Sequence, residues 1–162
     1  MLDRFGMSVE VRTVREAKLR VQVVDQRTAF DNNPEAFSDS VQSNQASLQQ
    51  KVVEAQILLN DVTIDEDLRL RISAVCGELD VDGLRGDIVT NRAARALAAF
   101  EGRKEVTEED IARVVSTALR HRLRKDPLEQ VDSGDRVIKA FCKIFEKNEN
   151  IDINEFELAT KN

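Results

Sequence analysis

The stretch Leu79-Asp80-Val81-Asp82-Gly83-Leu84-Arg85-Gly86-Asp87, residues 79–87, reads as the end of one helix, a tight turn and the start of another helix. Aspartate and glycine favour turns, and Gly83 takes a positive φ without steric cost. After the turn an apolar stripe follows at helical spacing, formed by Leu84, Ile88, Ala93, Ala96, Leu97 and Phe100, with Arg85, Arg92 and Arg95 on the other side. An arginine at a helix start suits a phosphate or a carboxylate, but it also suits a solvated helix face. This stretch leaves both interpretations open.

The composition around this stretch favours a mainly α fold. The 162 residues include seven Phe but no Trp or Tyr, so the core must consist of Leu, Ile, Val and Ala. Only six Gly and two Pro interrupt the chain, and 33% of its residues are charged. The net charge of -6 argues against nucleic acid as a partner. No apolar run reaches the length of a membrane span, so we expect a soluble chain.

The N-terminal residues 1–13 predict a short β-strand without a partner. Met7, Val9 and Val11 alternate with polar residues, which is typical of a strand with one buried face. We expect this orphan strand to be the remnant of a sheet that the chain does not contain.

The rest of the chain predicts a series of helices. Residues 14–30 place Ala17, Val21 and Val24 on one face, and a longer helix is expected from Pro34 to Leu59. The clearest pattern lies in residues 65–79, where the apolar positions Leu68, Ile72, Val75 and Leu79 follow one another at helical spacing. The helix after the turn ends at Gly102, and Thr107 begins the next one with a capping box. A last helix covers residues 133–145. This pattern divides the chain into an N-terminal remnant (1–13), a helical connector (14–62), a helical bundle (63–146) and a disordered polar tail (147–162).

Most familiar catalytic patterns are absent from the sequence. It contains no GxxxxGK[ST] loop for a nucleotide triphosphate and no GxSxG, HExxH or CxxC motif. With His121 as the single histidine, a histidine-based metal site or triad has little support, and no metal site is expected. Cys76 and Cys142 lie beside apolar stripes, so both are expected to be buried and to act as small hydrophobic residues.

A basic cluster at residues 120–125 follows the helix that Thr107 begins. These cations complement the negative end of that helix, or they form a contact with an anionic partner or a subunit. We expect His121, within the cluster, to be an ordinary surface histidine. Two other arginines are candidates for phosphate chemistry: Arg85, and Arg4 in Leu2-Asp3-Arg4-Phe5-Gly6, because the guanidinium stays charged and binds two oxygens at once.

Several separated motifs resemble one family. LDRFGMSVEVRT (residues 2–13) resembles the end of the ATPase core of AAA+ proteins, where this motif carries the arginine finger. The stretch CGELDVDGLRGDIVTNRAA (residues 76–94), together with RHRLRKDPL (residues 120–128), closely resembles the small ATPase subunit, the I subunit, of magnesium chelatase. The resemblance covers about residues 1–146 and points to the C-terminal portion of that subunit.

The resemblance implies a function that composition could not indicate. Magnesium chelatase uses ATP hydrolysis to insert Mg²⁺ into protoporphyrin IX in chlorophyll synthesis, a ligase reaction that forms nitrogen–metal bonds. Arg4 would be the arginine finger, Asp3 would help to form the subunit interface, and Arg85 would be the sensor-2 arginine that contacts ATP. The implied partners are a homo-oligomeric, hexameric ring and the two other chelatase subunits. The implied location is the chloroplast stroma or the cyanobacterial cytoplasm.

The sequence departs from the family pattern in three ways. The phosphate-binding loop and the Mg²⁺-binding acids are absent, so we expect this chain alone not to hydrolyse ATP. Plant relatives have a cysteine at the position of Ala118, and its absence argues against redox control through a pair with Cys76. The tail beyond residue 146 extends past the usual end of the family.

Two other functions remain open from the sequence. The chain could belong to a MoxR-like AAA+ chaperone, or it could be a non-enzymatic helical module that docks through residues 120–125.

Overall fold

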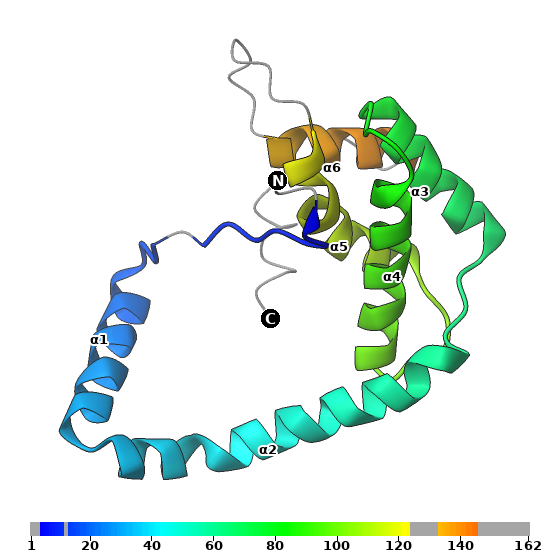
Figure 1. Cartoon of the computed structure of the whole chain (residues 1–162). Coiled ribbons are helices and arrows are strands. Elements are labelled where there is room, and N and C mark those ends of the chain that lie inside the picture. Colours follow the sequence, from blue (N-terminus) through cyan, green and yellow to red (C-terminus); the bar gives the residue numbers. More distant parts are fainter. Residues whose placement is uncertain (1–3, 12, 124–132, 146–162) are drawn as a thin grey trace. The chain divides into compact units, whose positions relative to one another are not determined.

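The computed structural model describes residues 4–11, 13–123 and 133–145. Contacts divide the chain into two compact units, Met1–Val9 with Ala55–Asn162 and Glu10–Glu54. The described part is mainly helical, as the sequence predicts (Figure 1). Its α-helices are α1 (Ala17–Asn32), α2 (Pro34–Leu58), α3 (Glu66–Glu78), α4 (Arg85–Phe100), α5 (Glu108–Leu119) and α6 (Ser133–Ile144). The short 3₁₀ helices are η2 (Leu59–Asp61) and η3 (Arg120–Arg122). The tail expected after residue 146 lies outside the described residues.

The unit of residues 10–54 contains α1 and most of α2. Asn33 separates the two helices, and its side-chain Oδ1 accepts a hydrogen bond of 3.0 Å from the Ala36 N–H. Pro34 occupies the first position of α2, where its missing N–H costs nothing. At the corner the rings of Phe30 and Phe37 meet edge to face at 5.8 Å. The predicted helices are therefore present. The apolar face predicted for α1 is not buried, however, since α1 has no buried residue.

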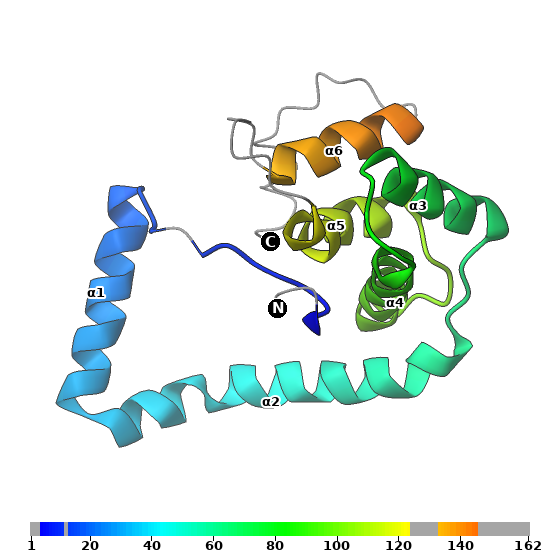
Figure 2. The same ribbon diagram turned by 45° about the horizontal axis from the view of Figure 1, so that its top comes forward.

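The other unit is built from α3, α4, α5 and α6. Figure 2 shows these four helices packed together, and α5 contacts each of the other three. The largest fully buried side chains of the core are Phe141, Ile72, Ile111 and Leu119, which come from α6, α3 and α5. Arg71 of α3 pairs with Glu108 of α5 at 3.0 Å and lies over the Phe145 ring next to α6. Buried apolar side chains and the contacts of Arg71 thus hold α3, α5 and α6 together.

The expected β-strand at residues 7–11 is not present. Within the described residues the only β-type pairing is an isolated bridge between Thr63 and Glu105. Val9 and Val11 are 70% and 92% exposed, so the alternation has no buried face. The described segment lacks a neighbouring strand that could accept its backbone hydrogen bonds. Ser8 contacts a helix instead of a strand, through a hydrogen bond of 2.9 Å from its N–H to the Thr117 carbonyl.

The apolar stripe expected on the helix after the turn is confirmed only in part, because Ala93 and Leu97 pack against the core but the other large residues do not. Leu84, Ile88 and Phe100 are 73%, 47% and 41% exposed. The buried face of α4 is instead formed by Gly86, Thr90, Ala94, Ala98 and Ala99. Four of these lie at intervals of four residues, on one face of the helix. Small side chains let α4 approach its neighbours closely, so this face contacts the core although it is weakly apolar.

Candidate functional site

Arg85 is the first residue of α4 and lies at the end of a tight turn. Asp80 has a φ of 50° and Gly83 a φ of 69°, so two residues of the turn are left-handed. The N-cap residue Leu84 supplies no side-chain hydrogen bond to the start of the helix. The first N–H groups of a helix have no partner within the helix and carry a partial positive charge. An exposed guanidinium beside them forms a cationic end suited to an anion.

The start of α4 is fixed in position by close packing under Arg85. Gly86 is buried, and a Cβ atom at this residue would lie 3.0 Å from Val81 Cγ1, 3.1 Å from Leu119 Cδ2 and 3.2 Å from Cys76 Sγ. On the next residue, the Asp87 carboxylate accepts a hydrogen bond of 2.6 Å from the Ser73 hydroxyl. The first turn of α4 is therefore held against α3 and α5.

Cys76 lies beneath this turn as an unreactive thiol. Its side chain is buried, as expected, and so is that of Cys142. Burial raises the pKa of Cys76 to about 12, and the charge and hydrogen bond of Asp87 add to the effect. The thiolate form needed for disulfide exchange is therefore scarce at neutral pH. Ala118 is fully buried as well, which agrees with an apolar role for this region.

Arg4 begins the N-terminal segment of the same unit. Its side chain is exposed, and within the described residues it forms no hydrogen bond or ion pair. Asp3 lies outside the described residues. Two residues after Arg4, a Cβ atom on Gly6 would lie 4.0 Å from Val89 Cγ1, and Val89 is one helical turn after Arg85. The segment that carries Arg4 thus approaches the helix that carries Arg85.

Arg122 and His121 hold this segment, a role that the sequence did not indicate. The Arg122 guanidinium donates to the Phe5 carbonyl at 2.8 Å and to the Gly6 carbonyl at 3.2 Å. His121 Nε2 lies 3.1 Å from the same Phe5 oxygen. The prediction that His121 is an ordinary surface residue is wrong, because its ring is half-buried and its other nitrogen is buried. The sequence of the basic cluster at residues 120–125 does not show which of its cations binds the N-terminal segment, which lies more than a hundred residues away in the chain.

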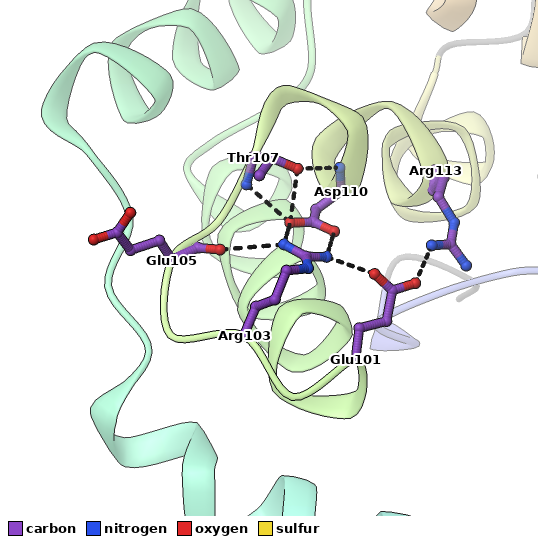
Figure 3. A network of polar contacts seen from close by, with 6 residues as sticks. All are labelled: Glu101, Arg103, Glu105, Thr107, Asp110 and Arg113. Atoms are coloured by element: carbon purple, nitrogen blue, oxygen red, sulfur yellow. Dashed lines mark hydrogen bonds and ion pairs between the residues drawn. The ribbon is translucent and has the colours of Figure 1, made fainter.

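A second cluster of charges, at the start of α5, is structural. Figure 3 shows Arg103 between Asp110 and Glu101, with Arg113 on the far oxygen of Glu101. Thr107 and Asp110 form the predicted capping box, in which each side chain accepts from the other's backbone N–H. Burial alone would raise the pKa of Asp110, but hydrogen bonds from Arg103 and from the Thr107 backbone lower it below its usual range. Every group in the cluster has a partner, so its role is to fix the loop between α4 and α5.

Neither a metal centre nor a membrane span is found in the described part of the chain. No group of three or more His, Cys, Asp and Glu side chains in residues 4–11, 13–123 and 133–145 is placed to hold a metal ion. Among the helices of these ranges, none is both long and apolar enough to cross a bilayer.

Comparison with known proteins gives the bundle a family. Residues 69–140 match the AAA lid domain. Magnesium-chelatase subunit ChlI of Synechocystis sp. is 65% identical over 145 residues, which are 90% of this chain and 41% of the relative. The subunit of the same name from Anabaena variabilis is 57% identical over all 162 residues, and these cover 47% of it. A chloroplastic one from Nicotiana tabacum is 59% identical over 90% of this chain and 34% of its own length. The chain therefore spans less than half the length of these relatives.

Proposed function

The chain belongs to the magnesium-chelatase subunit ChlI family, and from this membership we propose that it is the lid-bearing, C-terminal part of an ATPase subunit. In this role it takes part in coupling ATP hydrolysis to the insertion of Mg²⁺ into protoporphyrin IX, a ligase reaction of chlorophyll synthesis. The observation that carries the proposal is an identity of 57–65% over nine-tenths or more of the chain. This match includes the turn before α4 and the segment that carries Arg4.

Arg85 and Arg4 have separate roles in the proposal. Arg85 acts as the sensor-2 arginine, which contacts the phosphates of bound ATP from the start of α4. Arg4 acts as the arginine finger, which reaches the γ-phosphate of ATP held by a neighbouring subunit, with Asp3 at the same interface. Their exposure supports both roles, because a guanidinium that must reach a phosphate on another part of the assembly has to be accessible.

ATP and Mg²⁺ are substrates in this proposal, and the chain holds neither by itself. The exposed arginine at the start of α4 fits a phosphate oxygen, which is the contact that this chain offers. The sequence contains no GxxxxGK[ST] loop, so the ATP must be held by another stretch of polypeptide. We therefore propose that the isolated chain does not hydrolyse ATP.

The proposed partners are further copies of the subunit in a hexameric ring and the two other subunits of magnesium chelatase. The match to an AAA lid domain supports a ring, and in this proposal Arg4 acts across the interface between two subunits of that ring. The proposed location is the chloroplast stroma or the cyanobacterial cytoplasm, in keeping with relatives from tobacco chloroplasts and from cyanobacteria.

A chimera tests the proposal. This chain replaces the matching 145 residues of the Synechocystis relative, so that it is joined to that protein's ATPase core. Chelation of Mg²⁺ by protoporphyrin IX is then measured with the two other subunits and ATP. We expect the chimera to be active, Arg85→Ala to weaken ATP binding and abolish chelation, and Arg4→Ala to lower ATP hydrolysis by about 10³-fold or more.

Arg92→Ala is the matched control, since Arg92 is an exposed arginine of the same helix. It should leave both reactions unchanged, and far-UV circular dichroism should show that all variants fold. Full chelation by the Arg85→Ala chimera would contradict the assignment of Arg85. A chimera that hydrolyses ATP but never supports chelation would instead favour a MoxR-like AAA+ protein. One that assembles with no ATP-dependent activity would favour a helical docking module.

A further inference from the structure

The contact between Arg122 and the N-terminal segment joins two parts of one compact unit that lie more than a hundred residues apart in the sequence. Arg122 lies in η3, directly after α5, and Phe5 and Gly6 directly follow Arg4. The two carbonyls accept from one guanidinium nitrogen at 2.8 and 3.2 Å. The Ser8 N–H to Thr117 carbonyl bond then continues the contact onto the last turn of α5. The backbone that follows Arg4 is thus held at Phe5, Gly6 and Ser8.

Arg122 is itself well anchored before it reaches the segment. The residue is only 9% exposed, and its Nε donates to the Ala118 carbonyl at 3.0 Å. This bond also satisfies a carbonyl at the end of α5, where the helix leaves its last acceptors without partners. A guanidinium held at its Nε keeps its terminal nitrogens in a fixed plane, which makes it a rigid support.

Separation of the segment from Arg122 is unfavourable. The two carbonyls would lose charge-assisted hydrogen bonds, and a largely buried cation would keep fewer partners. An exposed ion pair can separate at little cost, because water solvates both of its charges. The buried Arg122 contact therefore fixes the position of the N-terminal segment more firmly than exposed cations of residues 120–125 would. His121 Nε2, at 3.1 Å from the Phe5 oxygen, reinforces the same point.

We propose that Arg122 is the positioning residue for the arginine finger: through the Phe5 and Gly6 carbonyls it fixes where Arg4 stands relative to α5 and α4. This inference rests on the proposed role of Arg4. Arg122 does not touch ATP, and it acts only by holding the backbone that follows Arg4. When helices α3 to α6 move as a unit, Arg4 moves with them, since residues 5–8 are hydrogen-bonded to the last turn of α5 and to Arg122.

The first test measures the contact without any activity. Hydrogen exchange at the Ser8 amide is followed by mass spectrometry or NMR in the full 162-residue chain. Wild-type protein should protect this amide through its bond to Thr117. Arg122→Met, which keeps the length of the side chain but removes every donor, should remove most of the protection, and Arg122→Lys should restore part of it.

The second test asks whether the contact matters for hydrolysis in the chimera described above. Arg122→Met should lower kcat for ATP by about 100-fold, since a misplacement near 1 Å has that scale of effect, and KM for ATP should change little. Combining Arg122→Met with Arg4→Ala should be no worse than Arg4→Ala alone, because both act through one group. Arg113→Met, in the preceding helix α5 and paired with Glu101, is the matched control and should leave kcat unchanged.

The outcomes separate this inference from the proposed function. Wild-type protection of Ser8 and wild-type kcat in Arg122→Met would overturn the positioning role. An additive loss in the double variant would also overturn it, since Arg122 would then act independently of Arg4. If Arg4→Ala itself hydrolyses ATP normally, the proposed role of Arg4 fails, while the exchange measurement still decides whether Arg122 holds the segment. If Arg122→Met does not fold, the same pattern in Arg122→Lys, in weaker form, decides the question.

Discussion

At Gly86 the backbone of α4 lies too close to its neighbours for a side chain. The three atoms nearest to a Cβ there come from the turn, from α5 and from α3, at 3.0 to 3.2 Å. Leu119 and Cys76 are themselves buried, so they have little room to move away. The position of Arg85 therefore depends on the absence of a side chain at the next residue.

Gly86→Ala should destabilise the chain by about 1 kcal/mol, because overpacking costs more than the helix gains from alanine. Gly77→Ala is the matched control on α3, where a Cβ meets nothing within 4 Å, and it should stabilise the chain by about 0.5 kcal/mol. Chemical denaturation gives both values. Equal effects of the two substitutions would contradict the close packing of α4.

Asp110 should make stability depend on pH in the acid range. Its pKa is lowered in the folded chain, so the carboxylate stabilises fully above the unfolded pKa of about 3.9. That contribution is lost as the pH falls from about 4 through the lower folded-state pKa. Asp110→Asn should therefore cost about 1.5–3 kcal/mol at pH 7, and this difference from wild type should shrink below about pH 4. Exposed Glu109→Gln is the control from the same helical turn, and a difference for Asp110→Asn that is constant down to pH 2 would refute the pairing with Arg103.

At the scale of the helix, α5 is held at both ends by side chains. The capping box of Thr107 and Asp110 begins it, and Arg122 satisfies the Ala118 carbonyl at its end. The loop before it starts with a Schellman motif at the end of α4, where Gly102 has a φ of 74° and the Arg103 N–H donates to the Ala98 carbonyl at 2.8 Å. The helix whose last turn contacts the N-terminal segment is thus fixed at both of its ends.

Thr107→Ala should lower the free energy of unfolding by about 1 kcal/mol, as the loss of an N-cap hydroxyl usually does. Thr107→Ser keeps the oxygen and should cost much less. Urea denaturation monitored by far-UV circular dichroism measures both variants. A loss of the same size in both would show that the methyl group, and not the cap, is what stabilises α5.

The helices that the sequence predicts best are those with conspicuous apolar faces and caps. For α3 and α5 the expected buried residues, such as Ile72 and Ile111, are buried. For α4 the expected stripe includes the large residues Leu84 and Ile88, which are exposed, whereas Ala94 and Ala98 are fully buried. Large apolar residues dominate a hydropathy pattern, whereas close helix packing needs small residues. The hydropathy pattern therefore predicts only part of the buried face of α4, the helix that begins with Arg85. The orphan strand failed for another reason, since alternation alone cannot supply a neighbouring strand.

The candidate site was predictable only in part. The resemblance and the chemistry of arginine point to Arg85 and Arg4, and the roles of both stay predictions. The sequence does not point to Arg122, because its partners are the backbone carbonyls of Phe5 and Gly6, and carbonyls are present at every residue. A sequence shows which side chains could bind an anion, but it does not show which of them is used to hold the backbone.

At the scale of the whole molecule, we propose that the chain offers Arg85 and Arg4 to a nucleotide that is held elsewhere in the assembly. With no GxxxxGK[ST] loop in its 162 residues, the isolated chain should release no phosphate from ATP above background. Phosphate release is measured with and without Mg²⁺, and the chimera serves as the positive control. Hydrolysis by the isolated chain that survives further purification would mean that the nucleotide site lies within these residues.

The central claim is that this chain places Arg4 at the ATP of a neighbouring subunit, and a mixing experiment tests it most directly. One chimera loses the lysine of the phosphate-binding loop in its core, the other carries Arg4→Ala, and each alone should be inactive. In an equal mixture roughly a quarter of the interfaces would combine an intact core with an intact Arg4 from the next subunit. The account predicts that ATP hydrolysis returns on mixing. A mixture as inactive as its two components, with mixed rings confirmed by mass spectrometry, would contradict it.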